Sequence, residues 1–352
     1  FDKNFNILPL QSEDISITSA AGRIITKDIV SPVDLPDFNR SSMDGYAVRA
    51  QDTFGATESL PAYLQIIGEV LMGEEPGVVI NKGTAAKIST GGMLPKGSDA
   101  VAILEHAQAI DKNSIEALYS VAPGENVVQV GEDIKKGEAL VKKGHKIRPQ
   151  DIGAFAGIGI DRVAVYAKPK VAVITTGNEI IDIKEDSRFG CVRDINSYYL
   201  STVINNDGGI PVRKGISKDD YSQLRRMIEE SLSGADVVVL SGGSSVGARD
   251  LTAKVINDIG KPGVLVHGIS IKPGKPTIIG VVNNKPVFGL PGHPVAVGVS
   301  YGLFVKRVIR SITGIVLKDG EFADRMVKAR LLKNIASASG REDYIRIEIR
   351  NE

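Results

Sequence analysis

Ser241–Gly247 is a run of glycine and serine residues that follows a short apolar segment, Val237–Leu240. The apolar segment has the length and β-branched composition of a buried parallel strand, and a helical pattern resumes at Asp250. A loop between such a strand and a helix presents backbone N–H groups that favour phosphates and other anions. A turn that needs glycines only for its geometry explains the loop equally well when it is taken alone. The loop matches neither a dinucleotide fingerprint, because Ser244 occupies the place of the middle glycine, nor a Walker loop, because it lacks Gly-Lys-Ser/Thr.

Acidic residues follow other predicted strands and could hold a divalent cation. Glu179 ends a Thr-Thr-Gly-Asn-Glu sequence, and Asp250 lies just beyond the glycine-rich loop. Together with Asp219 or Asp220, these carboxylates offer the oxygen ligands that Mg²⁺ prefers. The four scattered histidines and the one cysteine form no zinc-binding pattern.

Two lysines, Lys272 and Lys275, occupy a Lys-Pro-Gly-Lys-Pro loop. Loop lysines are usually only solvated, but two cations held by prolines and a glycine suit a small oxyanion or a phosphate. Asn196 lies in a segment, 194–197, that is expected to cap a helix, and a cap can also bind a ligand. A Gly-Leu-Pro-Gly-His-Pro sequence offers a further helix N-terminus, and its His293 is expected to pack or to cap rather than to catalyse.

Two polar turns in the N-terminal half could also contribute side chains. Asp44 follows Arg-Ser-Ser-Met and precedes Gly45, so it adds a carboxylate to a dense cluster of donors. Thr90 ends a predicted strand beside two glycines. Local chemistry alone favours a hairpin turn at Asp44–Gly45 and a glycine-rich turn after Thr90.

The overall composition excludes several classes of protein. The chain has 352 residues and a net charge of +1, whereas proteins that bind duplex nucleic acid usually have a strong basic excess. The longest apolar run, 294–305, is too short to span a bilayer. One cysteine, Cys191, excludes an internal disulfide and indicates a reducing cytoplasm. Because the chain opens at Phe1 without a methionine, and because its last segment is short, both natural ends are expected to be missing.

Changes of pattern along the chain predict a multidomain protein of the α/β plus β class. Short β segments separated by Gly, Pro and Asn turns predict a small inserted β domain. Alternating strand and helix patterns then predict an open, mostly parallel sheet that has helices on both faces and binds its ligand at the carboxyl ends of the strands. The predicted domains are a linker domain at 1–36 and 131–167, an inserted β domain at 37–130, an α/β domain at 168–316 and an incomplete C-terminal β module at 317–352.

Periodicity within these domains predicts individual elements. Ser217 with Asp220 resembles a capping box before a helix whose apolar face includes Leu224 and Ile228. The predicted strands of the sheet are Lys170–Thr175, Pro211–Ile216, Val237–Leu240, Val264–Ile271, Thr277–Val282 and Pro286–Leu290. The other predicted helices are Asn196–Asn206, Leu251–Ile259 and Val295–Ile312, and the last module is expected to contain strands at Arg325–Leu332 and Tyr344–Ile349.

Six motifs resemble, in the same order, those of the molybdopterin molybdenumtransferase family, which includes bacterial MoeA and the E domain of gephyrin. The resemblance covers nearly the whole chain, and the shared order of six motifs makes chance similarity improbable. The motifs are Met43–Ala47, Thr90–Gly91, Thr176–Glu179, Ser241–Gly247, Lys272–Pro276 and Gly289–Gly292.

The resemblance implies that adenylated molybdopterin and molybdate give molybdenum cofactor and AMP, with Mg²⁺ assisting cleavage of the pyrophosphate. It also implies a homodimer with shared active sites, in which Asp44 and Thr90 complete the site of the partner. The catalytic residues implied in this way are Asp44, Thr90, Glu179, Asp219 and Asp250, with Glu179 and Asp250 as the metal ligands. The implied binding residues are Thr176, Gly177, Asn196, Ser241, Gly242, Gly243, Ser244, Ser245, Gly247, Lys272, Lys275, Pro291 and Gly292.

Two positions depart from the pattern of the family. Many relatives carry a lysine where this chain has Gly268 and a serine where it has Ala296, so each change removes a contact to an oxyanion.

Two other functions stay open. A molybdopterin adenylyltransferase would use the α/β domain alone, and the long N-terminal region argues against it. The chain could also be a non-enzymatic scaffold of the gephyrin type, but its sequence contains no evident partner-binding motif that would support this function.

Overall fold

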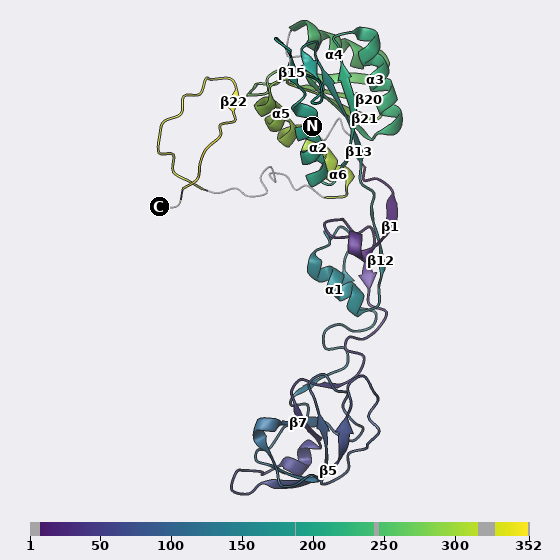
Figure 1. Ribbon diagram of the computed structural model, residues 1–352, viewed down its shortest axis with the longest axis vertical. Helices are drawn as coiled ribbons and strands as arrows, with labels where there is room; N and C mark the ends of the chain where they lie inside the picture. Colours follow the sequence, from purple (N-terminus) through teal and green to yellow (C-terminus); the bar gives the residue numbers. More distant parts are fainter. Residues whose placement is uncertain (1–7, 187, 243–245, 316–327, 351–352) are drawn as a thin grey trace. The chain divides into compact units, whose positions relative to one another are not determined.

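The computed structural model describes residues 8–186, 188–242, 246–315 and 328–350. The chain forms two compact units, whose elements are labelled in Figure 1. Both units are discontinuous in sequence, and the division into four domains stays a prediction. The α/β unit comprises Phe1–Lys27, Lys143–Pro149 and Arg162–Glu352, and the β unit comprises Asp28–Lys142 and Gln150–Asp161.

A six-stranded sheet forms the centre of the α/β unit, with the order β16-β13-β17-β21-β20-β18. Only β20 runs antiparallel to its neighbours, so this sheet is mostly parallel, as the alternating pattern predicted. Its strands are β13 (Lys170–Thr176), β16 (Ile210–Ser217), β17 (Val237–Gly242), β18 (Pro262–His267), β20 (Ile278–Val282) and β21 (Lys285–Leu290).

Helices cover both faces of this sheet (Figure 1), because successive side chains of a buried strand point to opposite sides. Val171 of β13 belongs to a buried cluster with Leu200 and Val308 on one face. Its neighbour Ala172 belongs to a second cluster with Leu224 on the other face. The helices are α2 (Asn196–Asn206), α3 (Tyr221–Gly234), α4 (Val246–Ile259) and a continuous helix formed by α5 (Pro294–Ser300), the π-helix η4 (Tyr301–Val305) and α6 (Lys306–Ile312).

The β unit contains a second six-stranded sheet, with the order β7-β4-β6-β5-β9-β8. Its strands are β4 (Gly45–Val48), β5 (Ala62–Val70), β6 (Thr84–Ile88), β7 (Ala100–Ile103), β8 (Ala107–Ala109) and β9 (Ser114–Ala117). The other elements of this unit are the pairs β2 (Ile29–Val30) with β11 (Ala139–Val141) and β3 (Arg40–Ser41) with β10 (Val127–Val128), the 3₁₀ turns η2 (Ala50–Thr53) and η3 (Leu104–His106), and α1 (Pro149–Gly157), which belongs to this unit from Gln150 onward.

The prediction of a hairpin turn at Asp44–Gly45 is wrong. β3 pairs with β10, whereas β4 pairs with β6 and β7, so the two strands that flank Asp44 do not form a hairpin. Gly45 serves instead for close approach between strands, because a Cβ at this position would lie 2.1 Å from the carbonyl oxygen of Ala102.

Three short pairs complete the α/β unit. They are β1 (Ser12–Ser16) with β12 (Arg162–Tyr166), β14 (Ile180–Ile181) with β15 (Val192–Arg193), and β19 (Ile271–Lys272) with β22 (Glu342–Asp343), and the 3₁₀ turn η1 (Ile17–Ser19) follows β1. Among the described residues, no helix combines the length and the apolar character that crossing a bilayer requires.

Three local predictions in the α/β unit need correction. Helix α4 begins at Val246, four residues before the predicted resumption of helix at Asp250. The cap of α3 is Asp220 alone, whose side chain accepts a hydrogen bond from the backbone N–H of Gln223, so Ser217 does not take part in a capping box. The strand predicted at Val264–Ile271 ends at His267, because Gly268 adopts a φ of 87° and turns the chain.

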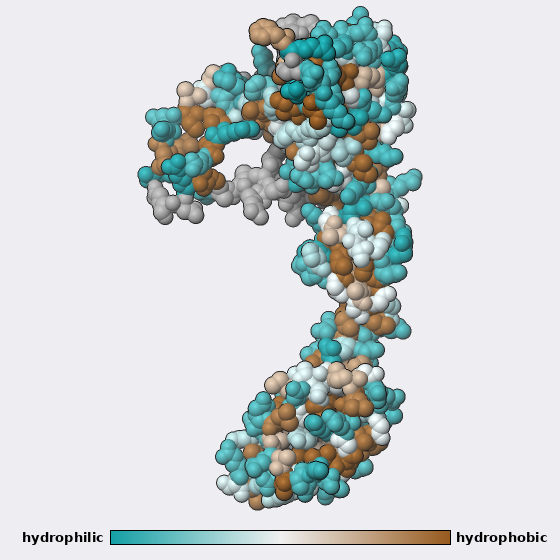
Figure 2. Space-filling view, in the orientation of Figure 1, coloured by the Kyte–Doolittle hydropathy of each residue, from teal (hydrophilic) through white to brown (hydrophobic). Residues whose placement is uncertain are grey.

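The strands predicted for the C-terminal module are wrong within residues 328–350. β22 is the only strand in that segment, and neither 328–332 nor 344–350 forms one. Apolar side chains of this segment, including Leu332 and Ile347, remain exposed, and Figure 2 shows the brown surface that they form. Alternating apolar residues form a strand only where a neighbouring strand accepts their backbone hydrogen bonds, and in 344–350 the described chain offers only the carbonyl oxygen of Lys272, which accepts from the N–H of Tyr344.

Candidate functional site

The carboxyl ends of the parallel strands converge at one edge of the α/β sheet. Thr176 at the end of β13 pairs with Ser217 of β16 and with Gly242 of β17, while Ser241 pairs with Leu290 of β21. A small cavity at this edge is lined by Thr176, Gly242, Thr252, Pro276 and Leu290, among other residues. The loop that contains Lys275 and Pro276 therefore approaches the strand ends.

Two glycines at this edge are required by their surroundings. Gly242 has a φ of 126°, and a Cβ there would lie 2.0 Å from the carbonyl oxygen of Thr176. Gly177 has a φ of 148°, and a Cβ there would lie 2.8 Å from a carboxylate oxygen of Glu179. Side chains at both positions would be strained as well as crowded, so geometry alone accounts for these glycines. Binding of a phosphate to the loop stays a prediction.

The loop that carries Glu179 is fastened to the end of β16. The ammonium of Lys218 donates hydrogen bonds to the carbonyl oxygens of Asn178 and Ile180 at 3.2 and 3.3 Å. The backbone N–H of Asp219 donates to the side-chain oxygen of Asn178 at 3.2 Å. The structure thus brings two predicted residues, Glu179 and Asp219, to adjoining loops, and both side chains are exposed. Lys218 was missed by the sequence analysis, and its place directly before Asp219 and Asp220, two candidate ligand residues, was the available signal.

Asn196 begins α2 and has one buried atom without a partner. Its side-chain N–H donates to the carbonyl oxygen of Gly292 at 2.8 Å, while its side-chain oxygen is buried and accepts no hydrogen bond from the described residues. Asp194 caps the same helix, because its carboxylate accepts hydrogen bonds from Thr175 and from the backbone and hydroxyl of Ser197. The loop that contains Pro291 is held from β17, since the hydroxyl of Ser241 donates to the Pro291 carbonyl oxygen at 3.4 Å.

The lysine loop has a rigid base and exposed tips. Gly274 is buried, and its carbonyl oxygen accepts a hydrogen bond from the hydroxyl of Thr277 at 2.7 Å. That hydroxyl lies 2.8 Å from the hydroxyl of Ser300 in α5. Lys272 and Lys275 project from this base and are both exposed. The loop therefore presents two cations on a fixed backbone.

A carboxylate lies next to one of these lysines. The pKa of Asp343 in β22 is lowered, chiefly by a hydrogen bond from Ser337, and also by Arg341 and by the charge of Lys272. β22 pairs with β19, which places Asp343 opposite Lys272. The negative charge of Asp343 thus offsets part of the positive charge of Lys272.

The remaining predicted residues of the edge lie on or near α4. Asp250 is exposed on this helix, and Gly247 is in its first turn. Gly243, Ser244 and Ser245 lie outside the described residues. Within the described parts of the chain, no three histidine, cysteine or acidic side chains gather in a way that could hold a metal ion. The assignment of Glu179 and Asp250 as ligands of Mg²⁺ stays a prediction, and this ion usually binds proteins through one or two carboxylates together with water and substrate phosphates.

Three further residues from the sequence analysis can be placed. His293 occupies the N-cap position of α5 but makes no capping hydrogen bond with its side chain, which is exposed. Gly268 needs its positive φ, so a lysine at this position would be strained in this backbone. Ala296 is 5% exposed, in a part of α5 that packs against the sheet.

In the β unit, the structure brings Asp44 and Thr90 together. One carboxylate oxygen of Asp44 accepts hydrogen bonds from the backbone N–H of Thr90 at 2.7 Å and from its hydroxyl at 3.0 Å. These two bonds lower the pKa of Asp44, the backbone bond more than the hydroxyl bond. The residues are 46 positions apart, and the sequence analysis named both as candidates but did not predict that they form hydrogen bonds with each other.

Comparisons with known proteins agree with this architecture. Residues 2–159 match the family profile described as the MoeA N-terminal region, domains I and II, and residues 172–311 match the profile described as a probable molybdopterin binding domain. A molybdopterin biosynthesis protein of Methanocaldococcus jannaschii is 39% identical over 346 residues, which cover 96% of this chain and 81% of that protein. A molybdopterin molybdenumtransferase of Nostoc is 31% identical over 97% of this chain and 79% of its own length.

A solved structure is similar over most of its length. It is the molybdopterin biosynthesis MoeA protein of Pyrococcus horikoshii, with 44% identity and a TM-score of 0.78 over 89% of this chain and 78% of that one. These comparisons confirm the resemblance that the six motifs indicated, and they extend it to the mixed α/β fold. The chain therefore belongs to the MoeA family of molybdopterin molybdenumtransferases, enzymes of molybdenum cofactor biosynthesis.

Proposed function

We propose that the chain inserts molybdenum from molybdate into adenylated molybdopterin and releases AMP. One observation carries the proposal: the ends of β13, β17 and β21 line a common cavity with the loop that holds Lys275. Backbone N–H groups beyond such strand ends favour phosphates, and a pair of lysines favours a dianion. The edge therefore suits a nucleotide with a pyrophosphate link next to a tetrahedral oxyanion.

Each group at the edge has a role in this proposal. The glycine-rich segment Ser241–Gly247, which includes the start of α4, binds the phosphates, and Lys272 and Lys275 attract molybdate. Glu179 and Asp250 hold Mg²⁺, which when bound neutralises negative charge on the departing phosphate. The protein supplies no nucleophile. The dithiolene sulfurs of the pterin replace oxygen ligands of the molybdenum, which leave as water, and a water molecule attacks the phosphorus of the pyrophosphate so that AMP departs.

Asn196 supports the assignment of the pterin to this edge. A buried oxygen without a hydrogen bond costs about 1–3 kcal/mol, and a ligand that donates an N–H group removes this cost. Pterins carry N–H donors on their ring and on their amino group. We therefore propose that the side-chain oxygen of Asn196 accepts a hydrogen bond from an N–H group of the substrate.

The homodimer, the shared active site and the cytoplasmic location stay predictions. By likeness to the family, Asp44 and Thr90 reach the site of the partner subunit. Their mutual hydrogen bonds fix the Asp44 carboxylate in its charged form, so it would act as a hydrogen-bond acceptor rather than as an acid.

The test is a single-enzyme assay with adenylated molybdopterin, molybdate and Mg²⁺. We expect stoichiometric release of AMP and formation of cofactor that activates a molybdenum-free apoenzyme. Both products should be lost when Mg²⁺ is omitted. A protein that instead makes adenylated molybdopterin from ATP and molybdopterin would be an adenylyltransferase, and a protein that does neither would be a scaffold.

Two variants test the metal assignment within the same assay. Glu179→Gln and Asp250→Asn keep the size of each side chain, so we expect folded proteins with turnover reduced by about 100-fold or more. Asp186→Asn is the matched control, since Asp186 is an exposed carboxylate that follows the Glu179 loop, and it should retain full activity. Wild-type rates for both test variants would remove the metal site from the proposal.

A further inference from the structure

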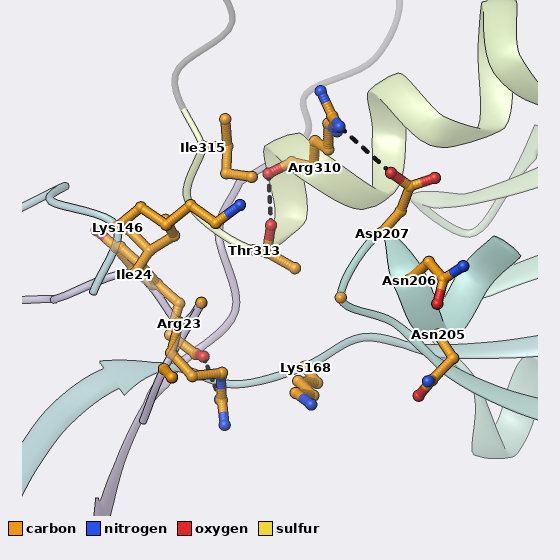
Figure 3. A pocket seen from close by; sticks show the side chains of 14 residues that line it. Arg23, Ile24, Lys146, Lys168, Asn205, Asn206, Asp207, Arg310, Thr313 and Ile315 are labelled. Atoms are coloured by element: carbon orange, nitrogen blue, oxygen red, sulfur yellow. Dashed lines mark hydrogen bonds and ion pairs between the residues drawn. The ribbon is translucent and has the colours of Figure 1, made fainter. Parts of the chain in front are cut away.

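A cavity of about 210 Å³ lies in the α/β unit, away from the candidate site (Figure 3). Lys168 lies just before β13, and Asn205–Gly208 lie just before β16, and all of these residues line the cavity. They mark the amino edge of the parallel strands, whereas Thr176 and Gly242 mark the carboxyl edge. The cavity is therefore separate from the edge that the proposed reaction uses.

Two arginines are held in the wall of this cavity. The side chain of Arg23 is 13% exposed, pairs with Glu13 and donates to the carbonyl oxygen of Tyr166 at 2.6 Å. The guanidinium of Arg310, at the end of α6, lies 3.4 Å from the carboxylate of Asp207, whose side chain is 12% exposed. Both guanidinium groups thus have fixed positions before any ligand arrives.

Two lysines complete the lining and have no anionic partner among the described residues. Within the described parts of the chain, the ammonium groups of Lys146 and Lys168 make no hydrogen bond or ion pair. Figure 3 shows that the side chain of Lys146 extends from its own wall toward the wall formed by Arg310 and Thr313. Neither lysine belongs to α2 or α6, so neither is explained as a cap for the end of a helix.

The charges around the cavity leave a positive surplus. Of the described residues, four cations and one carboxylate line it, and the ammonium of Lys306 lies 3.8 Å from Asp207. Glu13 offsets Arg23, and Asp207 and the carboxyl ends of α2 and α6 lie beside Arg310 and Lys306. Lys146 and Lys168 therefore supply the two positive charges with which no described carboxylate pairs, and two positive charges match those of a divalent oxyanion.

The volume limits the size of the ligand. Pockets for drug-sized molecules usually measure about 300–1,000 Å³, so this cavity suits a smaller group. The amide groups of Asn205 and Asn206 offer further hydrogen bonds in the lining. We propose that this cavity binds a compact divalent oxyanion of the phosphate class, either as a free ion or as the end group of a small phosphoester.

The test measures binding of inorganic phosphate by titration calorimetry at fixed ionic strength. The parent protein for all variants is Lys272→Met/Lys275→Met, because these substitutions remove the lysine pair of the candidate active site. The pocket variant adds Lys146→Met/Lys168→Met, and the matched control adds Lys27→Met/Lys214→Met. Lys27 and Lys214 are exposed lysines of the same unit that do not line the cavity, so both variants lose two positive charges.

We expect the parent and the matched control to bind phosphate equally, and the pocket variant to bind it at least about tenfold more weakly. A pocket variant with Lys146→Arg/Lys168→Arg should keep binding, which separates loss of charge from loss of fold. Equal affinity in the pocket variant and the matched control would overturn the proposal, as would the absence of phosphate binding by the parent.

Further titrations identify the source of the oxyanion. Glycerol phosphate and pyrophosphate test a phosphoester and a larger ion, and sulfate and molybdate test other divalent oxyanions. Tighter binding of glycerol phosphate than of free phosphate identifies the end group of a phosphoester, and the reverse order identifies a free ion. Crystals soaked in molybdate should show an anomalous peak between Arg23 and Lys168, and a peak only at the carboxyl edge would contradict the site.

Discussion

Gly242 and Thr176 approach so closely that a Cβ at position 242 would lie 2.0 Å from the carbonyl oxygen of Thr176. The two residues end adjacent strands, β17 and β13, and they pair in register. This contact sets the spacing between β13 and β17 at their carboxyl ends, where the glycine-rich segment that is proposed to bind phosphate begins. A side chain at position 242 would separate the strand ends that line the small cavity.

Gly242→Ala should therefore lower both stability and activity. Relief of the clash requires the strand ends to move, and the φ of 126° adds strain for alanine. We expect a loss of about 2 kcal/mol or more in the free energy of unfolding in urea, with AMP release reduced in parallel. Gly302→Ala is the control, because a Cβ at Gly302 would meet nothing within 4 Å. It should leave stability unchanged or raise it, and a similar loss in both variants would contradict the explanation.

Thr90→Val should raise the pKa of Asp44. The substitution removes the hydroxyl bond and keeps the stronger backbone bond, so the pKa should rise part of the way toward 3.8, the ordinary value for an aspartate. Titration of the Asp44 carboxyl carbon by NMR measures this change. Thr90→Ser keeps the hydroxyl and should behave as the wild type, while an unchanged pKa in Thr90→Val would show that the hydroxyl does not contribute.

The same hydrogen bonds predict a pH dependence of stability. The folded-state pKa of Asp44 lies below its value in the unfolded chain, so the bonds contribute their full stability above the unfolded pKa of about 3.8. That contribution is lost as the pH falls from there through the folded-state pKa. Wild type and Asp44→Asn should therefore converge in unfolding free energy at low pH, and a constant difference over this range would contradict the lowered pKa.

Lys218→Met should weaken the binding of Mg²⁺, although Lys218 itself is not proposed to contact the metal. Its ammonium holds the backbone on both sides of Glu179, so the variant should loosen that carboxylate. Residues that orient a metal ligand typically change metal affinity or activity by about 10–100-fold. We expect a higher Mg²⁺ concentration for half-maximal AMP release, with Lys218→Arg restoring part of the loss. An unchanged Mg²⁺ dependence would leave Lys218 with a purely structural role.

Mixed dimers test whether two subunits share one site. Asp44→Ala and Asp250→Asn should each be inactive as homodimers if both residues act in the reaction. Heterodimers of the two variants would contain one intact site, so each heterodimer should have about half of the activity of a wild-type dimer, and a fully exchanged 1:1 mixture should recover about a quarter. No recovery in dimers with proven exchange would place Asp44 and Asp250 in the same subunit's site.

The sequence by itself determined the class of fold and the family. Alternating periodicity predicted the parallel sheet, because burial of both faces requires uninterrupted apolar strands such as Val237–Leu240. Six short motifs predicted the family, and α2 begins and ends at the predicted residues, Asn196 and Asn206. These features are local, so they can be read from neighbouring residues.

The tertiary structure decided what depends on residues far apart in the chain. The role of Gly45 is set by Ala102 in a neighbouring strand, and the lowered pKa of Asp44 is set by Thr90. The basic cavity combines Arg23 with Arg310, which no sequence spacing connects. Apolar alternation predicted a strand at Tyr344–Ile349 that does not form, because a strand requires a hydrogen-bonding neighbour that its own sequence does not encode.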